Sequence, residues 1–189
     1  MHDVERFSRW APTYDRHFLQ RFLFTPVQET VLRLAAEQVP QPTAILDVGC
    51  GTGRLLRSAQ ARFAGARLDG VDPAPGMVEQ ARGSSDGINF QLGSAEKLPH
   101  PDAAFDLVFS TMTFHHWADQ QRGAAEIARV LRTGGRWILA DFVATGVMAY
   151  VTRLFRVTQF PQRARLGAML ARAGLRVVAE RRVRAQIQV

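Results

Sequence analysis

Short, nearly continuous runs of apolar residues recur along this chain and alternate with longer stretches whose apolar residues repeat at helical spacing. Such runs are typical of strands covered on both faces of a sheet, and their alternation with helices indicates an α/β fold with a parallel sheet. The predicted strands span residues 44–48, 67–71, 88–92, 105–110 and 137–142.

The first forty residues indicate helices that precede the sheet. Residues 25–28, Thr-Pro-Val-Gln, have the form of a capping box with proline at the first helical position, and they predict a helix to about Val39. Residues 10–15 predict a loop before it, because Pro12 disfavours helical backbone in the residue that precedes it. We therefore expect residues 1–40 to form an N-terminal helical segment interrupted by a loop.

The chain after the fourth predicted strand alternates in the same way. Asp119 is expected to cap the helix that follows this strand. Residues 143–160 are apolar with scattered arginines, and they predict a small helical cover. Residues 161–173 predict a helix ended by Gly174. A closing pair of strands is expected at 176–183 and 185–189.

Length and composition fit one globular domain. The chain has 189 residues, of which 47% are apolar and 22% charged, and domains typically have about 100–200 residues. Residues 1–5 lack the apolar core of a signal peptide, and the weakly polar run 142–151 is shorter than the roughly 20 residues that cross a bilayer. A single cysteine, Cys50, rules out internal disulfides and multi-thiolate metal sites. We expect one domain, residues 1–189, in the cytoplasm and without a metal.

The stretch 45–54 is a buried strand that runs into a glycine-rich turn and then into a helix. Gly49, Gly51 and Gly53 permit a sharp turn and leave no side chain in the way of a ligand, while the helix points its first N–H groups at the same place. A dinucleotide site would carry G-x-G-x-x-G, but Arg54 occupies the position of the third glycine. The absence of G-K-S/T excludes a P-loop. Cys50 within this turn is expected to be a tightly packed small residue rather than a nucleophile.

Five sequence blocks together resemble the class I S-adenosylmethionine (SAM) methyltransferases, most of all the small-molecule branch with the UbiE-like quinone C-methyltransferases. Residues 45–54 match the motif h-h-D-x-G-x-G-x-G, and the other blocks are 71–72, 93–96, 105–110 and 131–136. The match covers roughly residues 8–142. It implies a doubly wound, seven-stranded, mostly parallel Rossmann-like sheet with helices on both faces. The implied reaction is in-line methyl transfer from SAM to an O, N or C nucleophile of a small molecule.

The resemblance also assigns cofactor contacts to residues at the ends of the predicted strands. Asp47, a carboxylate within an apolar strand, needs hydrogen-bond partners, which the backbone N–H groups of the glycine loop and the cofactor's ammonium group could supply. Asp72 would accept both ribose hydroxyls, with helix capping as the alternative. Ser94 stands where the family usually has an acidic or amide residue, and the backbone N–H of Ala95 would bond the adenine. The residues expected to bind SAM, or its product S-adenosylhomocysteine (SAH), are Tyr14, Asp47, Gly49, Cys50, Gly51, Thr52, Gly53, Asp72, Pro73, Met77, Ser94, Ala95, Glu96 and Ser110.

Residues 111–117 follow the fourth strand, on the side where an open α/β sheet gathers its catalytic groups. They contain His115 and His116, and they lack the Asn/Asp-Pro-Pro-Tyr run of methyltransferases that act on DNA amino groups. Either imidazole is a candidate general base, since histidine accepts a proton near neutral pH. The alternative is structural: the pair caps the next helix or holds the loop.

Positive charge is concentrated at the C-terminal end. The net charge is +7, and residues 150–189 hold nine arginines against Glu180 alone. Such a segment can attract an anionic acceptor or form a solvated face, and helical spacing of the arginines favours the solvated face. No known nucleic-acid-binding fold or aromatic-interleaved basic run is present. We therefore expect a small-molecule acceptor, anionic or hydrophobic, rather than nucleic acid.

Two other functions stay open from the sequence. A SAM-binding protein without catalytic activity would keep residues 45–96 but lack an acceptor pocket. A dinucleotide-dependent oxidoreductase would need the glycine that Arg54 displaces. The identity of the acceptor and the oligomeric state are also left open.

Overall fold

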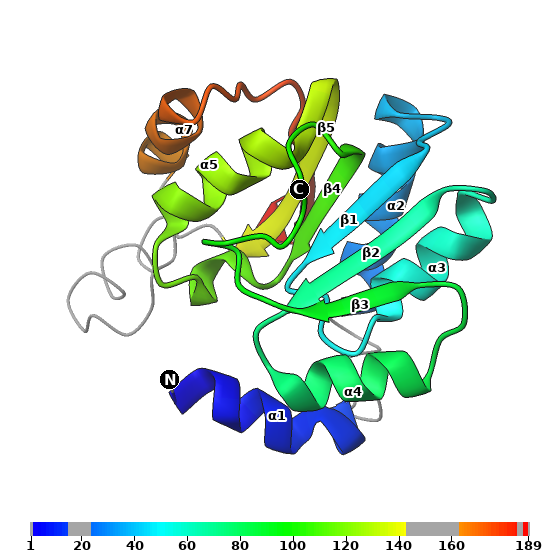
Figure 1. Ribbon diagram of the computed structural model, residues 1–189. Coiled ribbons are helices and arrows are strands. Elements are labelled where there is room, and N and C mark those ends of the chain that lie inside the picture. Colours follow the sequence, from blue (N-terminus) through cyan, green and yellow to red (C-terminus); the bar gives the residue numbers. More distant parts are fainter. Residues whose placement is uncertain (1, 15–23, 143–162, 185–186, 189) are drawn as a thin grey trace.

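Parallel strands form the centre of the structure, a computed structural model that describes residues 2–14, 24–142, 163–184 and 187–188 (Figure 1). The parallel strands are β1 Ala44–Val48, β2 Arg67–Asp72, β3 Asn89–Leu92, β4 Phe105–Thr111 and β5 Leu131–Phe142. They confirm the expected Rossmann-like parallel sheet. Two short strands complete the order β3-β2-β1-β4-β5-β7-β6, and β7 is antiparallel to both of its neighbours.

The strand order fixes where a ligand can bind. From β1 the chain proceeds outward through β2 to β3, then returns to β4 on the other side of β1. The loops that leave the carboxyl ends of β1 and β4 therefore diverge, and they open a crevice at the sheet edge where α/β proteins hold their ligands. This edge points toward helix α1, His2–Tyr14, in Figure 1.

Helices cover both faces of the sheet, as the all-buried pattern of β1 requires. One hydrophobic core joins the sheet to α2, α3 and α4, and a second joins its other face to α5 and α7. The helix bounds are α2 Thr25–Gln38, α3 Arg54–Arg62, α4 Pro75–Gly83, α5 Gln120–Val130 and α7 Arg163–Arg172. A short 3-10 helix, η2, spans Phe114–His116 after β4. The expected cover at 143–160 lies outside the described residues.

The loop expected at residues 10–15 is wrong, because α1 continues as a helix through Pro12 to Tyr14. A proline inside a helix removes the hydrogen bond to the carbonyl four residues earlier, here that of Ser8. This carbonyl packs against α4 instead: a Cβ on Gly76 would lie 2.5 Å from the Ser8 oxygen. The contact between the two helices thus stabilises a proline that local sequence rules would place at a break.

The capping box expected at residues 25–28 is also wrong. Phe24, with φ −79° and ψ −38°, precedes the first turn of α2, and no side chain caps the helix there. Thr25 lies inside the helix, and its hydroxyl accepts a hydrogen bond from Arg54 Nη2 at 2.7 Å. A partner at the start of α3 therefore occupies the hydroxyl that the sequence pattern assigned to capping.

Other predicted helix ends are confirmed. Asp119 caps α5, its Oδ1 accepting from the backbone N–H of Arg122 at 3.0 Å. Gly174 follows α7 with φ +77°, a left-handed conformation in which the N–H of Leu175 reaches the carbonyl of Leu170 at 2.9 Å.

The closing strand pair is shorter than expected. β6 spans Arg182–Arg184 and β7 spans Ile187–Gln188, whereas residues 176–181 adopt no strand. Residues 185–186 and 189 lie outside the described residues. The described residues therefore show five parallel strands and a short antiparallel closing pair, and the extent of the domain stays a prediction.

Candidate active site

The glycine-rich turn after β1 bends across the end of β2. The N–H groups of Gly49 and Cys50 both donate to the carbonyl of Val71, at 2.7 and 3.1 Å. Gly51 follows with φ +53°, and no described atom lies within 4 Å of where its Cβ would be. The turn thus presents a left-handed residue to open space, and any side chain at Gly51 would fill that space. This is the shape expected of a cradle for a ligand.

Asp72 holds the two halves of this cradle together. Its Oδ2 accepts from the N–H of Gly51 and its Oδ1 from the N–H of Ala74, both at 2.9 Å. The carboxyl group is buried, and this burial raises its pKa. Asp72 therefore links the glycine turn to the start of α4. Each carboxylate oxygen retains a second lone pair that can accept another hydrogen bond. Acceptance of the ribose hydroxyls by Asp72 stays a prediction.

Asp47 is the strongest sign that a cation belongs in the cradle. Its side chain is buried inside β1, and its Oδ1 has no hydrogen-bond partner among the described residues. Burial, and then the nearby charge of Asp72, raise the pKa of Asp47 to about 8. A buried carboxylate without a partner is costly. An ammonium group placed beside it would remove much of that cost, so these residues fit the amino-acid end of SAM.

Cys50 has the packing role expected of it. The thiol is buried against the strand at Gly70, where a Cβ would lie 3.0 Å from Sγ. Burial raises the pKa of Cys50 well above its usual value, with smaller contributions from Asp47 and Asp72. Such a thiol stays protonated and does not act as a nucleophile.

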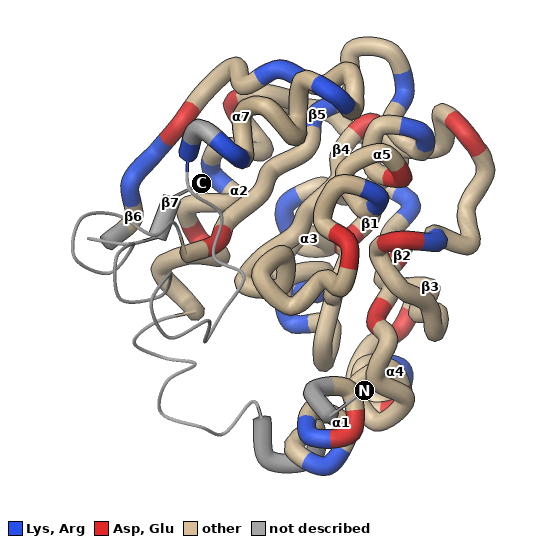
Figure 2. Tube along the Cα trace, turned by 90° about the vertical axis from the view of Figure 1, so that its left-hand side faces the viewer, with Lys and Arg blue, Asp and Glu red and all other residues tan. Residues whose placement is uncertain are grey.

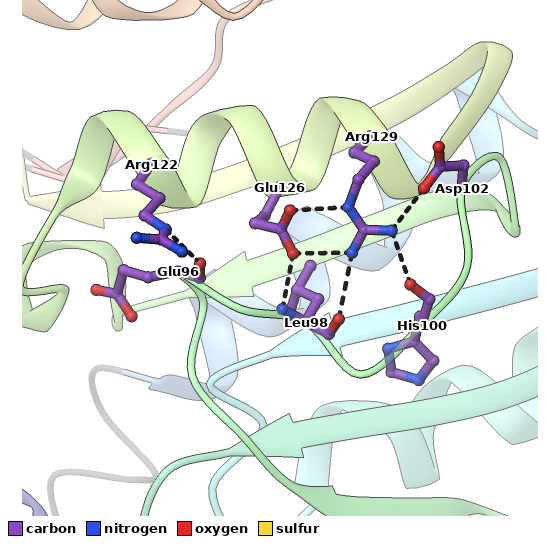
Figure 3. A network of polar contacts seen from close by, with 7 residues as sticks. All are labelled: Glu96, Leu98, His100, Asp102, Arg122, Glu126 and Arg129. Atoms are coloured by element: carbon purple, nitrogen blue, oxygen red, sulfur yellow. Dashed lines mark hydrogen bonds and ion pairs between the residues drawn. The ribbon is translucent and has the colours of Figure 1, made fainter.

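The segment predicted to bind adenine is clamped onto α5 (Figure 3). Ser94 is half-buried and forms an isolated bridge with Lys97, and Ala95 is buried. The Glu96 carboxylate accepts from the N–H of Asp119 at 3.1 Å, and the Glu96 carbonyl accepts from Arg122. The carboxylate thus contacts the start of α5, and cofactor binding by Glu96 stays a prediction.

Arg129 forms the centre of this clamp (Figure 3). Its guanidinium donates to both carboxylate oxygens of Glu126, at 2.7 and 2.8 Å, and to the carbonyls of Leu98 and His100. These hydrogen bonds from Arg129 lower the pKa of Glu126. Glu126 in turn accepts from the N–H of Leu98 at 2.8 Å. The loop between β3 and β4 is therefore fixed by one ion pair on α5.

Four further expected cofactor contacts stay predictions. Met77 is buried in a small cluster between α1 and α4. Ser110 is fully buried, and its hydroxyl accepts from Trp137 Nε1 at 3.2 Å. Pro73 is exposed beside the cradle. Tyr14 is the last residue of α1, and its side chain lies outside the described part of the structure.

The two histidines lie beside the cradle. A Cβ on Gly49 would lie 2.1 Å from the Thr113 hydroxyl, so the glycine turn and the loop before η2 are in direct contact. His115 Nδ1 lies 2.7 Å from Asp141 Oδ1, and the His115 N–H donates to Asp141 Oδ2 at 3.1 Å. The ring centroids of His115 and His116 are 4.0 Å apart. A carboxylate at Nδ1 holds the proton there, which makes Nε2 the basic nitrogen.

Asp141 is the functional candidate that the sequence prediction missed. It is buried near the end of β5, and it also accepts from the N–H of Phe142 at 2.7 Å. The signal was present: an acidic residue stands at or next to the carboxyl end of an apolar strand here, as Asp47 and Asp72 do in β1 and β2. Its partner, however, stands on a different loop, and sequence spacing alone does not show that pairing.

Neither a metal site nor a membrane span is found in the part of the chain that the structure describes. No group of three or more potential ligands from His, Cys, Asp and Glu comes together there. No helix among these residues is long and apolar enough to cross a bilayer.

Comparison with known proteins identifies the family. A family model described as a methyltransferase domain matches residues 46–139. The demethylmenaquinone methyltransferase of Deinococcus radiodurans is 35% identical over 175 residues, covering 88% of this chain and 70% of that protein. The malonyl-[acyl-carrier protein] O-methyltransferase of Hahella chejuensis is 40% identical over 142 residues, covering 74% and 49%. The chain thus spans about half the length of the second relative.

A solved structure agrees with these relatives. A SAM-dependent methyltransferase of Thermotoga maritima superposes with a TM-score of 0.70 at 26% identity, covering 89% of this chain and 78% of that one. Methyl transfer is thereby favoured over the dinucleotide-dependent reaction that the sequence left open, and SAM is the cofactor that gives SAH. This chain belongs to the class I SAM-dependent methyltransferases, in their UbiE-like small-molecule branch.

Proposed function

We propose that the residues of the cradle divide the binding of SAM among them. Asp47 takes the ammonium group, because its buried Oδ1 lacks a partner among the described residues. Asp72 takes the ribose hydroxyls while it holds Gly51 in place, and Ser94 and the N–H of Ala95 take the adenine. SAM itself supplies an electrophilic methyl group on a sulfonium. The chain's own contribution is to bind and orient the two reactants, which can supply up to about 7–11 kcal/mol in intramolecular models.

We further propose that His115 is the general base and that Asp141 orients it. The single observation that carries this proposal is the 2.7 Å contact between His115 Nδ1 and Asp141 Oδ1. It fixes both the ring orientation and the tautomer, so Nε2 is the nitrogen that takes a proton from the acceptor. His115 thus takes the chemical role in the pair, and His116 shapes the site beside it.

The surroundings of the His pair favour an apolar ring-bearing acceptor with an ionisable hydroxyl. Aromatic rings from two elements lie beside it: the ring centroid of Phe7 of α1 is 5.2 Å from that of His116, and the centroid of Phe142 of β5 is 5.9 Å from that of His115. Such rings suit another ring through stacked or edge-on packing. Of the substrates named in the relatives' descriptions, the ring of demethylmenaquinone fits this setting better than a malonyl group.

The test compares His115→Gln and Asp141→Asn with the unaltered protein, using a naphthohydroquinone as the ring acceptor and a malonyl thioester as the alternative. We expect His115→Gln to lower turnover at least about 100-fold while SAH affinity changes little. Asp141→Asn should lower turnover and change its pH profile, since the amide no longer selects the Nδ1–H tautomer. Wild-type rates and pH profiles in both variants would show that the enzyme works by placement alone.

A stability measurement separates the chemical from the structural role. If the two variants lose SAH affinity and thermal stability in parallel with turnover, the His115–Asp141 pair only holds the loop. Faster transfer to the malonyl thioester than to the hydroquinone would replace the ring acceptor by an anionic one. Cytoplasmic location stays a prediction, and the oligomeric state stays open.

A further inference from the structure

Helix α1 connects the two halves of the active site. Toward the cofactor side it packs on α4, where the N–H of Gly76 lies 3.4 Å from Ser8 Oγ and the backbones touch at the Ser8 carbonyl. Toward the acceptor side its Phe7 ring meets His116 edge-on, with centroids 5.2 Å apart and planes at 78°. The position of α1 over α4 therefore sets how close Phe7 lies to the His pair.

Phe7 differs from the residues that only join the two helices. Ala11, Ala74 and Met77 are buried in the contact between α1 and α4, and Val4 packs against them at the edge. Phe7 also packs there, but it is half-buried and has aromatic neighbours on both sides. Trp10 lies edge-on at 6.2 Å, and the Arg6 guanidinium lies over both rings, 5.3 Å from Phe7 and 5.6 Å from Trp10.

The aromatic series ends at the solvent. Trp10 is 52% exposed, which is unusual for so large an apolar side chain, while His116 leads inward to His115 and Asp141. Ring contacts thus run in series from the exposed Trp10 through Phe7 to His116 and His115. A planar acceptor bound at the His pair would have the Phe7 ring beside it.

We propose that Phe7 is a specificity-determining residue of the acceptor site, the wall against which a ring acceptor packs when its nucleophile faces His115. The proposal rests on the proposed function of the His115 site. Phe7 takes no part in proton transfer; it selects acceptors by the shape and area that they offer to an aromatic edge. A pocket contact of this kind typically discriminates between related substrates by about 10- to 200-fold.

The experiment measures kcat and KM for a series of hydroquinones of increasing ring area, in Phe7→Ala, Phe7→Tyr and Val4→Ala proteins. We expect Phe7→Ala to raise the acceptor KM about tenfold or more and to flatten its dependence on ring area. SAH affinity should stay within about threefold, and Phe7→Tyr should restore the selectivity because it keeps the ring. Val4→Ala is the matched control, since Val4 packs in the same cluster and has no ring to offer.

Equal effects of Phe7→Ala and Val4→Ala would overturn the proposal, because Phe7 would then act only by holding α1. Loss of SAH affinity in step with acceptor affinity would overturn it in the same way. The proposals for Phe7 and for His115 can fail separately. An inactive His115→Gln protein with unaltered selectivity in Phe7→Ala refutes only the role of Phe7. Changed selectivity in Phe7→Ala with an active His115→Gln protein refutes the base alone.

Discussion

Protonation of Asp47 is expected to be coupled to cofactor binding. Burial raises the pKa of this carboxyl group to about 8, so the ligand-free protein carries it mostly protonated at neutral pH. An ammonium group beside it favours the ionised form, so binding expels the proton. Calorimetry of SAH binding near pH 7 should therefore show release of most of one proton, measured from the dependence of the heat on the buffer. Release should fade as the pH rises well above 8.

The same shift gives a sign for the stability of the ligand-free protein. The folded pKa of Asp47 lies above the unfolded value of 3.8, so the native state binds the proton more tightly. The contribution of Asp47 to the free energy of unfolding is therefore full below about pH 4 and is lost as the pH rises through about 8. Asp47→Asn should remove both this dependence and the proton release. Heats that do not vary with the buffer in the unaltered protein would contradict the assignment.

At the scale of helices and strands, one glycine determines how α1 docks. Gly76→Ala would place a Cβ 2.5 Å from the Ser8 carbonyl oxygen, a backbone atom that cannot move aside alone. We expect α1 to shift from α4, the acceptor KM to rise as in Phe7→Ala, and SAH affinity to fall only slightly. Gly83→Ala is the control, because Gly83 ends the same helix and no described atom lies within 4 Å of its Cβ position. Similar kinetics in the two variants would contradict this view of the docking.

Local sequence patterns predicted the strands well where both faces of the strand are buried, because such strands are nearly continuous apolar runs. β1 begins and ends where its apolar run does, and β2, β3 and β4 differ by a residue at most at either end. β5 starts earlier than expected, at Leu131, because that residue pairs with Phe105 of β4 before an irregularity in register. Pairing with a neighbour thus extends a strand over Gly134 and Gly135, which no sequence rule would include.

The site was predictable only as far as its residues lie within one motif. Asp47, Gly51 and Asp72 could be placed because each stands at a fixed distance from a strand end. Asp141 and Phe7 could not, since each contacts its partner on another element: His115 for the first and His116 for the second. Thr25 was misjudged for the same reason, because Arg54 occupies its hydroxyl. Pro12 was misjudged because the Ser8 carbonyl, which it leaves without its helical hydrogen bond, packs against Gly76.

For the whole molecule, the question is whether its charge takes part in function. Figure 2 shows basic positions at the edge of the sheet near β6, and Arg165, Arg172, Arg176 and Arg182 are exposed. Arg163 forms an ion pair with Glu180. With a neutral ring acceptor, we expect methyl transfer to stay nearly constant between low and moderate ionic strength, because these arginines form a solvated face.

A variant with one reversed charge on this arginine surface tests the same point. Arg165→Glu should leave turnover unchanged if the face is only solvated, with SAH affinity as a control for folding. A steep fall of the rate with added salt, weakened further in Arg165→Glu, would instead mean that the surface attracts an anionic acceptor. That outcome would also turn the choice of acceptor toward the malonyl group.

The docking of α1 on α4 has a consequence for how acceptor range can change. The proposed base and the cradle belong to the sheet and its loops, whereas Phe7 is carried on a helix that rests on α4 beside Gly76. An N-terminal helix from a relative, transplanted onto this chain with Gly76 kept, would bring a different wall to an unaltered catalytic apparatus. Acceptor choice in this branch would then depend on a helix that can be exchanged between relatives. Chimeras that differ only in residues 2–14 should have the acceptor preferences of the relative that supplied the helix.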